Sequence, residues 1–157
     1  MVLRKMIRGQ SAVELALGLP FLVLLLVVVG DFARAFYIAM GVASAARAGV
    51  QYGAQSYVKA VDNPGMIQAA DNDGQNISGL SVTPTHFCMC DGDQCTPAQS
   101  SSCIIPCDAP PASCTEPKVF VQVTTSATFS TLIKYPGVPS IIPLQSIAVL
   151  QAQKGAS

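Results

Sequence analysis

Residues 8–30 read RGQSAVELALGLPFLVLLLVVVG and decide the fold, because they place a long apolar run near the start of the chain. No charged residue occurs from Leu15 to Gly30, and this stretch extends about 24 Å as an α-helix. Uncharged residues precede the run, and Phe32, Phe36 and Tyr37 follow it as an aromatic belt suited to a membrane interface. The combined length predicts one membrane span.

Residues 1–10 contain three charged side chains, and all three are basic: Arg4, Lys5 and Arg8. Positive charge is retained on the cytoplasmic side of a membrane, so we expect the N-terminus in the cytoplasm and the remainder of the chain on the other side. In a bacterium this predicts a single-pass inner-membrane protein with a periplasmic C-terminal domain.

The overall composition supports a membrane-associated chain. Of the 157 residues, 50% are hydrophobic and only 11% are charged, whereas soluble globular domains carry about 25% charged residues. Nine basic and nine acidic side chains give a formal net charge of zero. Nucleic-acid binding is therefore not expected, because the sequence has no strong basic footprint.

The sequence contains no recognisable catalytic motif. His86 is its single histidine, and no Ser/His/Asp set, glycine-rich phosphate loop or paired-carboxylate motif accompanies it. We therefore predict neither enzymatic activity nor a cofactor, and we expect His86 to be an ordinary surface residue on a strand.

Glu14 is the most informative charge, because it stands at the head of the apolar run, where an ionisable group is costly and by default indicates function. The stretch from Arg8 to Leu15, a basic residue and a glycine followed five residues later by Glu14, resembles the cleavage region of type IV prepilins. In those proteins a prepilin peptidase cuts after the glycine, and the glutamate becomes the fifth mature residue. The resemblance implies cleavage between Gly9 and Gln10, and an assembly role for Glu14 opposite the N-terminal amine of a neighbouring subunit.

A wider set of short motifs resembles the TadE-like family, the pseudopilins or minor pilins of tight-adherence (Tad/Flp) pili. The resemblance covers about the first 50 residues, with Asp31 in place of a commoner glutamate and Ser44 in place of a frequent asparagine. It implies a role in pilus assembly, in contact with other pilins and pseudopilins, the prepilin peptidase, the inner-membrane assembly platform and membrane lipid. The motifs are Ala12-Val13-Glu14, Leu19-Pro20, Asp31-Phe32, Arg34-Ala35, Ala45-Ala46-Arg47, Gly49 and Tyr52-Gly53-Ala54.

Three segments are predicted: a leader at residues 1–9, a membrane-spanning and extended helix at 10–57, and a periplasmic α+β domain at 58–157. In the extended helix, small residues recur every four positions and allow close approach of another element. That element is either the chain's own sheet or another subunit, and both remain open. We also expect a solvated ion pair between Asp31 and Arg34, three residues apart. The small residues are Gly41, Ala45, Gly49 and Gly53.

The outer domain is predicted to contain a small antiparallel sheet that packs against the helix. Asp62-Asn63-Pro64 is a helix-start signal, and we expect a short helix over Met66–Ala70. The clearest strand spans residues 119–129, where apolar residues alternate with polar ones. Two further strands are expected at Leu80–Phe87 and Ile141–Gln151, the latter near a sheet edge because of Pro143.

All six cysteines fall within residues 88–114, among Pro, Ser, Asp and Gly. This predicts a disulfide-stapled loop in an oxidising compartment, with fifteen pairings open. The spacings do not fit structural zinc, so no metal is expected. Residues 71–76 partly match a calcium loop but lack its downstream glutamate, so we interpret them as a turn. The cysteines are Cys88, Cys90, Cys95, Cys103, Cys107 and Cys114.

Two alternatives to the pilin interpretation remain. One is a secretory signal peptide cleaved after Ala33-Arg34-Ala35, although Glu14 and the long helical pattern argue against it. The other is an uncleaved single-span protein whose disulfide-stapled periplasmic domain binds a ligand or calcium.

Overall fold

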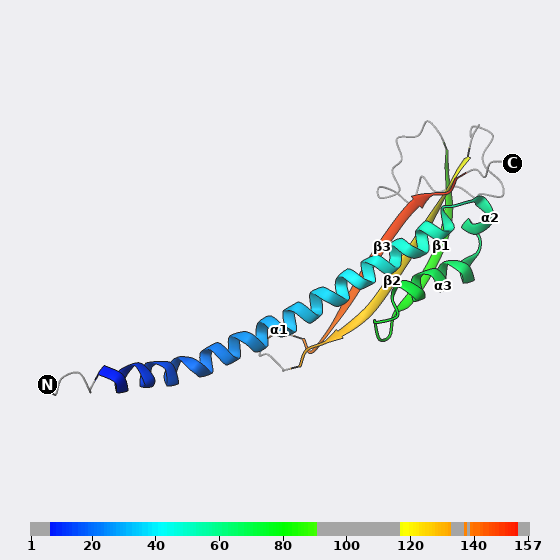
Figure 1. Cartoon of the computed structure of the whole chain (residues 1–157). Coiled ribbons are helices and arrows are strands. Elements are labelled where there is room, and N and C mark those ends of the chain that lie inside the picture. Colours follow the sequence, from blue (N-terminus) through cyan, green and yellow to red (C-terminus); the bar gives the residue numbers. More distant parts are fainter. Residues whose placement is uncertain (1–6, 91–116, 133–136, 138, 154–157) are drawn as a thin grey trace. The chain divides into compact units, whose positions relative to one another are not determined.

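The computed structural model describes residues 7–90, 117–132, 137 and 139–153 (Figure 1). The chain divides into two compact units, residues 1–37 and 38–157, which are described separately. In chain order the elements are three helices and three strands within the described residues. The α+β prediction is confirmed: a long N-terminal helix packs on a three-stranded antiparallel sheet.

The first helix, α1, spans Ile7–Gly53 and has 47 residues. It begins three residues earlier and ends four residues earlier than the predicted range 10–57. The early end has a local cause, because Ser56 caps a separate short helix, α2, at Tyr57–Ala60. The Ser56 hydroxyl accepts a hydrogen bond from the Lys59 backbone N–H at 3.3 Å, which satisfies a donor at the start of α2.

Helix α3 spans Asn63–Asp73 and is longer than the predicted Met66–Ala70. Its start confirms the sequence signal: the Asp62 carboxylate accepts a hydrogen bond from Gly65 N–H at 3.1 Å, and a proline lies in the first turn. Gly74 forms the C-terminal cap. The acidic segment predicted as a turn therefore lies partly inside the helix.

Strands β1 (Ser81–Cys90), β2 (Pro117–Ser130) and β3 (Ile141–Gln151) form one antiparallel sheet in the order β1-β2-β3. Strand β1 begins one residue later and ends three residues later than predicted, β2 extends beyond its predicted range at both ends, and β3 matches its prediction. Thr125 of β2 pairs with Val82 on one side and Ser146 on the other. Pro143 lies on an edge strand of this sheet, as its missing N–H requires.

The core of the outer unit lies between one face of the sheet and the helices. Alternate residues of β2 are buried there, which confirms the period-two pattern read from residues 119–129. A buried hydrogen bond from the Thr125 hydroxyl to the Val42 carbonyl, 2.7 Å long, joins β2 to α1. The principal core cluster comprises Val50, Ala60, Met66, Val121, Val123 and Ala152.

Candidate functional site

The N-terminal part of α1 exposes its apolar side chains. Between Ser11 and Gly53, the helix contains an 18-residue window of mean hydropathy 2.7, none of which is buried. Phe21 is 83% exposed and Leu17 75%. A contiguous apolar surface of this kind requires a cover, and the length and composition of the helix are sufficient to cross a membrane.

The predicted processing and assembly residues lie near the start of α1. Gly9 and Gln10 belong to its first turn, because the helix begins at Ile7. Glu14 lies one turn further along, exposed between Val13 and Leu15, which are themselves 60% and 63% exposed. The helix macrodipole stabilises carboxylates mainly within the first turn. Glu14 lies beyond that turn, so the macrodipole explains its position only weakly.

Asp31 and Arg34 form the predicted ion pair, with 3.3 Å between Arg34 Nη1 and Asp31 Oδ1. The prediction that this pair is solvated is wrong for one partner. The Asp31 side chain is only 6% exposed, whereas that of Arg34 is 48% exposed. Because a buried charge is costly unless it is paired, the contact with Arg34 helps to stabilise the Asp31 carboxylate.

The small residues of α1 that recur every four positions lie against the chain's own elements in the outer unit. A Cβ added at Gly49 would lie 3.1 Å from both the Met66 carbonyl oxygen and Val123 Cγ1. At Gly53 it would lie 2.9 Å from Val121 Cγ1, and at Gly41 it would lie 2.7 Å from a side-chain atom of Ile77. These contacts are made within the chain, and subunit packing through the same residues stays a prediction.

A polar cluster that the sequence did not reveal joins the end of α1 to the start of α3. The Tyr52 hydroxyl donates a hydrogen bond to Asp62 Oδ2 at 2.8 Å, and Lys59 Nζ lies 4.7 Å from the centroid of the Tyr52 ring. The bond from Tyr52, together with that from Gly65 N–H, holds the pKa of the Asp62 carboxyl below its usual value. The same carboxylate, by accepting this bond, raises the pKa of the Tyr52 phenol. The cluster holds together the two ends of the segment between α1 and α3, which contains α2.

The remaining candidate residues show no assembled chemical site. His86 is exposed on β1, which confirms its prediction as a surface strand residue. Asp71 and Asp73 are exposed in the last turn of α3, where helical geometry replaces the loop that a calcium site would need. Among the described residues, no group of three His, Cys, Asp or Glu side chains is placed to hold a metal ion.

The structure describes little of the cysteine segment. Cys88 is buried in β1, with 1% exposure, and Cys90 ends that strand. The other four cysteines lie outside the described residues. The predicted disulfides and their pairing therefore stay predictions.

A comparison with known protein families finds a match that lies within helix α1. Residues 9–51 match the family model TadE-like protein. The match confirms the resemblance seen in the sequence and runs along α1 from Gly9 to Gln51, so it includes Glu14, Asp31 and Arg34. Neither a curated protein nor a solved structure matched the chain. The TadE-like match and the apolar helix are together consistent with a single-pass, membrane-anchored protein.

Proposed function

We propose that the chain is a TadE-like pseudopilin or minor pilin that takes part in assembling a Tad/Flp type IV pilus. The observation that carries the proposal is the coincidence of the TadE-like match, residues 9–51, with one continuous helix, Ile7–Gly53. That helix has an exposed apolar part, suited to a membrane and to neighbouring helices, and a part that is buried in a folded outer unit. Its role is structural and requires no catalysis.

In this proposal residues 1–9 form a leader, 10–57 form the membrane-spanning and extended helix, and 58–157 form the periplasmic domain. A prepilin peptidase removes the leader on the cytoplasmic side by cutting after Gly9. The mature subunit then enters assembly with the inner-membrane platform and other pilins. The three basic residues of the leader support this orientation.

Glu14 has the central part in this assembly. A carboxylate among exposed apolar side chains requires a positive partner once those side chains are covered, because a buried unpaired charge is heavily penalised. The amine that cleavage creates at Gln10 of a neighbouring subunit provides such a partner. The pairing would fix the height of one helix relative to the next.

Determining the mature N-terminus by mass spectrometry of protein purified from its native membrane tests the proposal. We expect Gln10 as the first residue. Gly9→Val should block processing. Gly18→Val in the same helix should not, because an added Cβ there would have no atom within 4 Å beyond its chain neighbours and the helix's own backbone. A mature chain that begins at Phe36 would indicate a secreted domain, and one that retains Met1 would indicate an uncleaved anchor. Either result would refute the proposed processing.

A further inference from the structure

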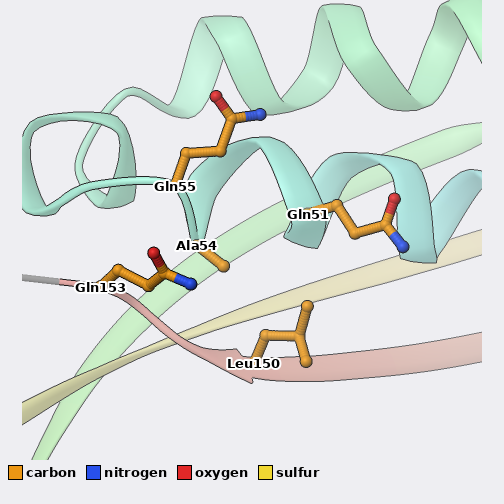
Figure 2. A pocket seen from close by; sticks show the side chains of 5 residues that line it. All are labelled: Gln51, Ala54, Gln55, Leu150 and Gln153. Carbon is orange, nitrogen blue, oxygen red and sulfur yellow. The ribbon is translucent and has the colours of Figure 1, made fainter.

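The outer flank of the domain, where α1 and β3 meet, is open. Two adjoining hollows of about 310 and 340 Å³ lie along this line. Figure 2 shows the first of them, with Leu150 pointing from β3 toward α1 and Gln153 lying beside Ala54. Their walls include Arg47 and Gln51, one turn apart on α1, and Gln55 in the turn just beyond the end of that helix.

Within the part of the chain that the structure describes, the outer edge of β3 has little of the usual protection against pairing. The strand is 11 residues long and contains no charged residue, and its single proline, Pro143, lies near one end. Within the described sheet, no further strand pairs with its outer edge. Ile147 is 59% exposed and Leu150 42%. Monomeric proteins usually place lysine, proline or a covering element on such an edge, so this one is suited to a partner.

Arg47 is the one charged side chain lining these two hollows. It is exposed and has no ion-pair partner among the described residues. A partner that covers the hollows must therefore either desolvate this guanidinium or present a carboxylate to it, and the second arrangement is far less costly.

The opposite flank of the same domain has the complementary charge. Helix α3 packs on the other side of α1, because an added Cβ at Gly49 would lie 3.3 Å from Ala70 Cβ. Asp71 and Asp73 are exposed at the end of α3, and no basic residue lies in its last turn. Carboxylates are unfavourable at a helix C-terminus, so a cation supplied by a neighbour would stabilise them.

Arg47 on one flank and the carboxylates of Asp71 and Asp73 on the other lie at nearly the same level along the axis of α1. A Cβ added at Gly74, the cap of α3, would lie 3.5 Å from Ala45 Cβ. Arg47 is two residues further on, a rise of about 3 Å, and is rotated by about 200° around the helix to the opposite side. A copy placed beside the first by lateral displacement would therefore bring its carboxylates to the level of Arg47.

We infer that the α1–β3 flank binds the α3 flank of a second copy of this chain, with Arg47 of one copy facing Asp71 and Asp73 of the next. Because the two surfaces differ, the contact is heterologous and can continue from copy to copy. The inference rests on the proposed function only in that anchoring in one membrane gives neighbouring copies a high effective concentration and a common orientation.

Photo-cross-linking of the full chain in its native membrane tests this contact. Two differently tagged copies are co-expressed, with a photoreactive amino acid replacing Leu150 in one of them. We expect cross-linked dimers, and about a fivefold loss of them for Arg47→Glu or for Asp71→Lys combined with Asp73→Lys, the effect of roughly one exposed ion pair. Arg47→Lys, which keeps the charge, is the matched control and should cross-link like the parent.

Reciprocal rescue decides the outcome. Pairing an Arg47→Glu copy that contains the cross-linker with an Asp71→Lys, Asp73→Lys copy should restore the dimer. Three results would overturn the inference. The yield of dimers could be the same for the charge variants as for the parent, position 150 could cross-link only to other polypeptides, or no cross-link could form. If any of these occurs while Gln10 remains the mature N-terminus and deletion of the chain still abolishes pili, the proposed function stands and only the self-contact fails.

Discussion

One helix has two surfaces of opposite character. Between Leu15 and Val29, α1 exposes apolar side chains, and an added Cβ at Gly18 or Gly30 would have no atom within 4 Å beyond its chain neighbours and the helix's own backbone. Between Val42 and Gly53, by contrast, the helix is packed so tightly on β2 and α3 that a methyl group at Gly49 would lie only 3.1 Å from its nearest neighbours. Among the described residues nothing covers the first surface, whereas the second is packed on β2 and α3. Substitutions in the first should therefore affect assembly, and those in the second should affect folding.

The largest effect is expected for Glu14→Ala in the exposed part of the helix. We predict loss of piliation and of cross-links to partner pilins, with normal membrane insertion and a normally folded outer domain, because the change only removes a charge from an apolar surface. Electron microscopy of pili, together with protease resistance of the outer domain, measures the two properties. Glu14→Gln, which keeps the shape but not the charge, should behave in the same way. Normal pili in the Ala variant would show that the carboxylate has no assembly role.

Next in size is Gly49→Leu in the packed part. The new side chain would clash with the Met66 carbonyl and Val123, and overpacking of this kind against backbone costs about 3 kcal/mol. Thermal unfolding of the full chain in detergent, followed by circular dichroism, measures the loss. Gly30→Leu is the matched control and should unfold like the parent. Equal stability of the two variants would remove the distinction between the two surfaces.

A smaller difference is expected between two valines of the same helix. Val50→Ala deletes two buried methyl groups from the core cluster and should destabilise the outer domain by about 2 kcal/mol. Val29→Ala removes the same atoms from a side chain that is 56% exposed and should leave unfolding unchanged. Chemical denaturation of both variants in the same detergent provides the comparison. A larger loss for Val29 would mean that this part of the helix also packs within the chain.

The smallest effect concerns the Tyr52–Asp62 hydrogen bond. Asp62 has a lowered pKa in the folded chain, so its contribution is present above its unfolded value, about 3.9, and is lost as pH falls through the folded value. Tyr52 has a raised pKa, so its contribution is present below about 10 and is lost as pH rises through the folded value. Asp62→Asn should slightly weaken the loss of stability both at low pH and at high pH. Thermal melts recorded over a range of pH values measure this change. Asp71→Asn is the control. If it weakened the pH dependence of stability to the same extent, the Tyr52–Asp62 hydrogen bond would not be its source.

The features predictable from sequence were those encoded locally. The apolar run that begins at Leu15 follows from its lack of charged residues, and the strand β2 follows from a period of two. The start of α3 follows from Asp62 and its neighbouring proline. The positions of Gly9 and Glu14 in the first turns of α1 were likewise accessible from a short motif.

The features that escaped prediction depend on partners distant in sequence or on competing caps. The burial of Asp31 has no signature in its neighbours, which are exposed on α1. The bond between Tyr52 and Asp62 spans ten residues and requires α1 to end at Gly53. That end is determined by the capping of α2 by Ser56, which a continuous helical pattern concealed. The open α1–β3 flank requires both elements to be placed before it can be recognised.

The backbone N–H of Gln153 donates a hydrogen bond to the carbonyl of Ala54 at 2.9 Å, immediately beyond the last turn of α1. The chain therefore leaves the helix at Ala54, builds α2, α3 and the sheet, and returns to its point of departure. In evolutionary terms this makes residues 54–153 a cassette whose two ends need only one shared attachment point. Such a segment can lengthen or acquire loops away from α1 without separating its two ends, whereas its face against Val42, Gly49 and Gly53 stays constrained by packing.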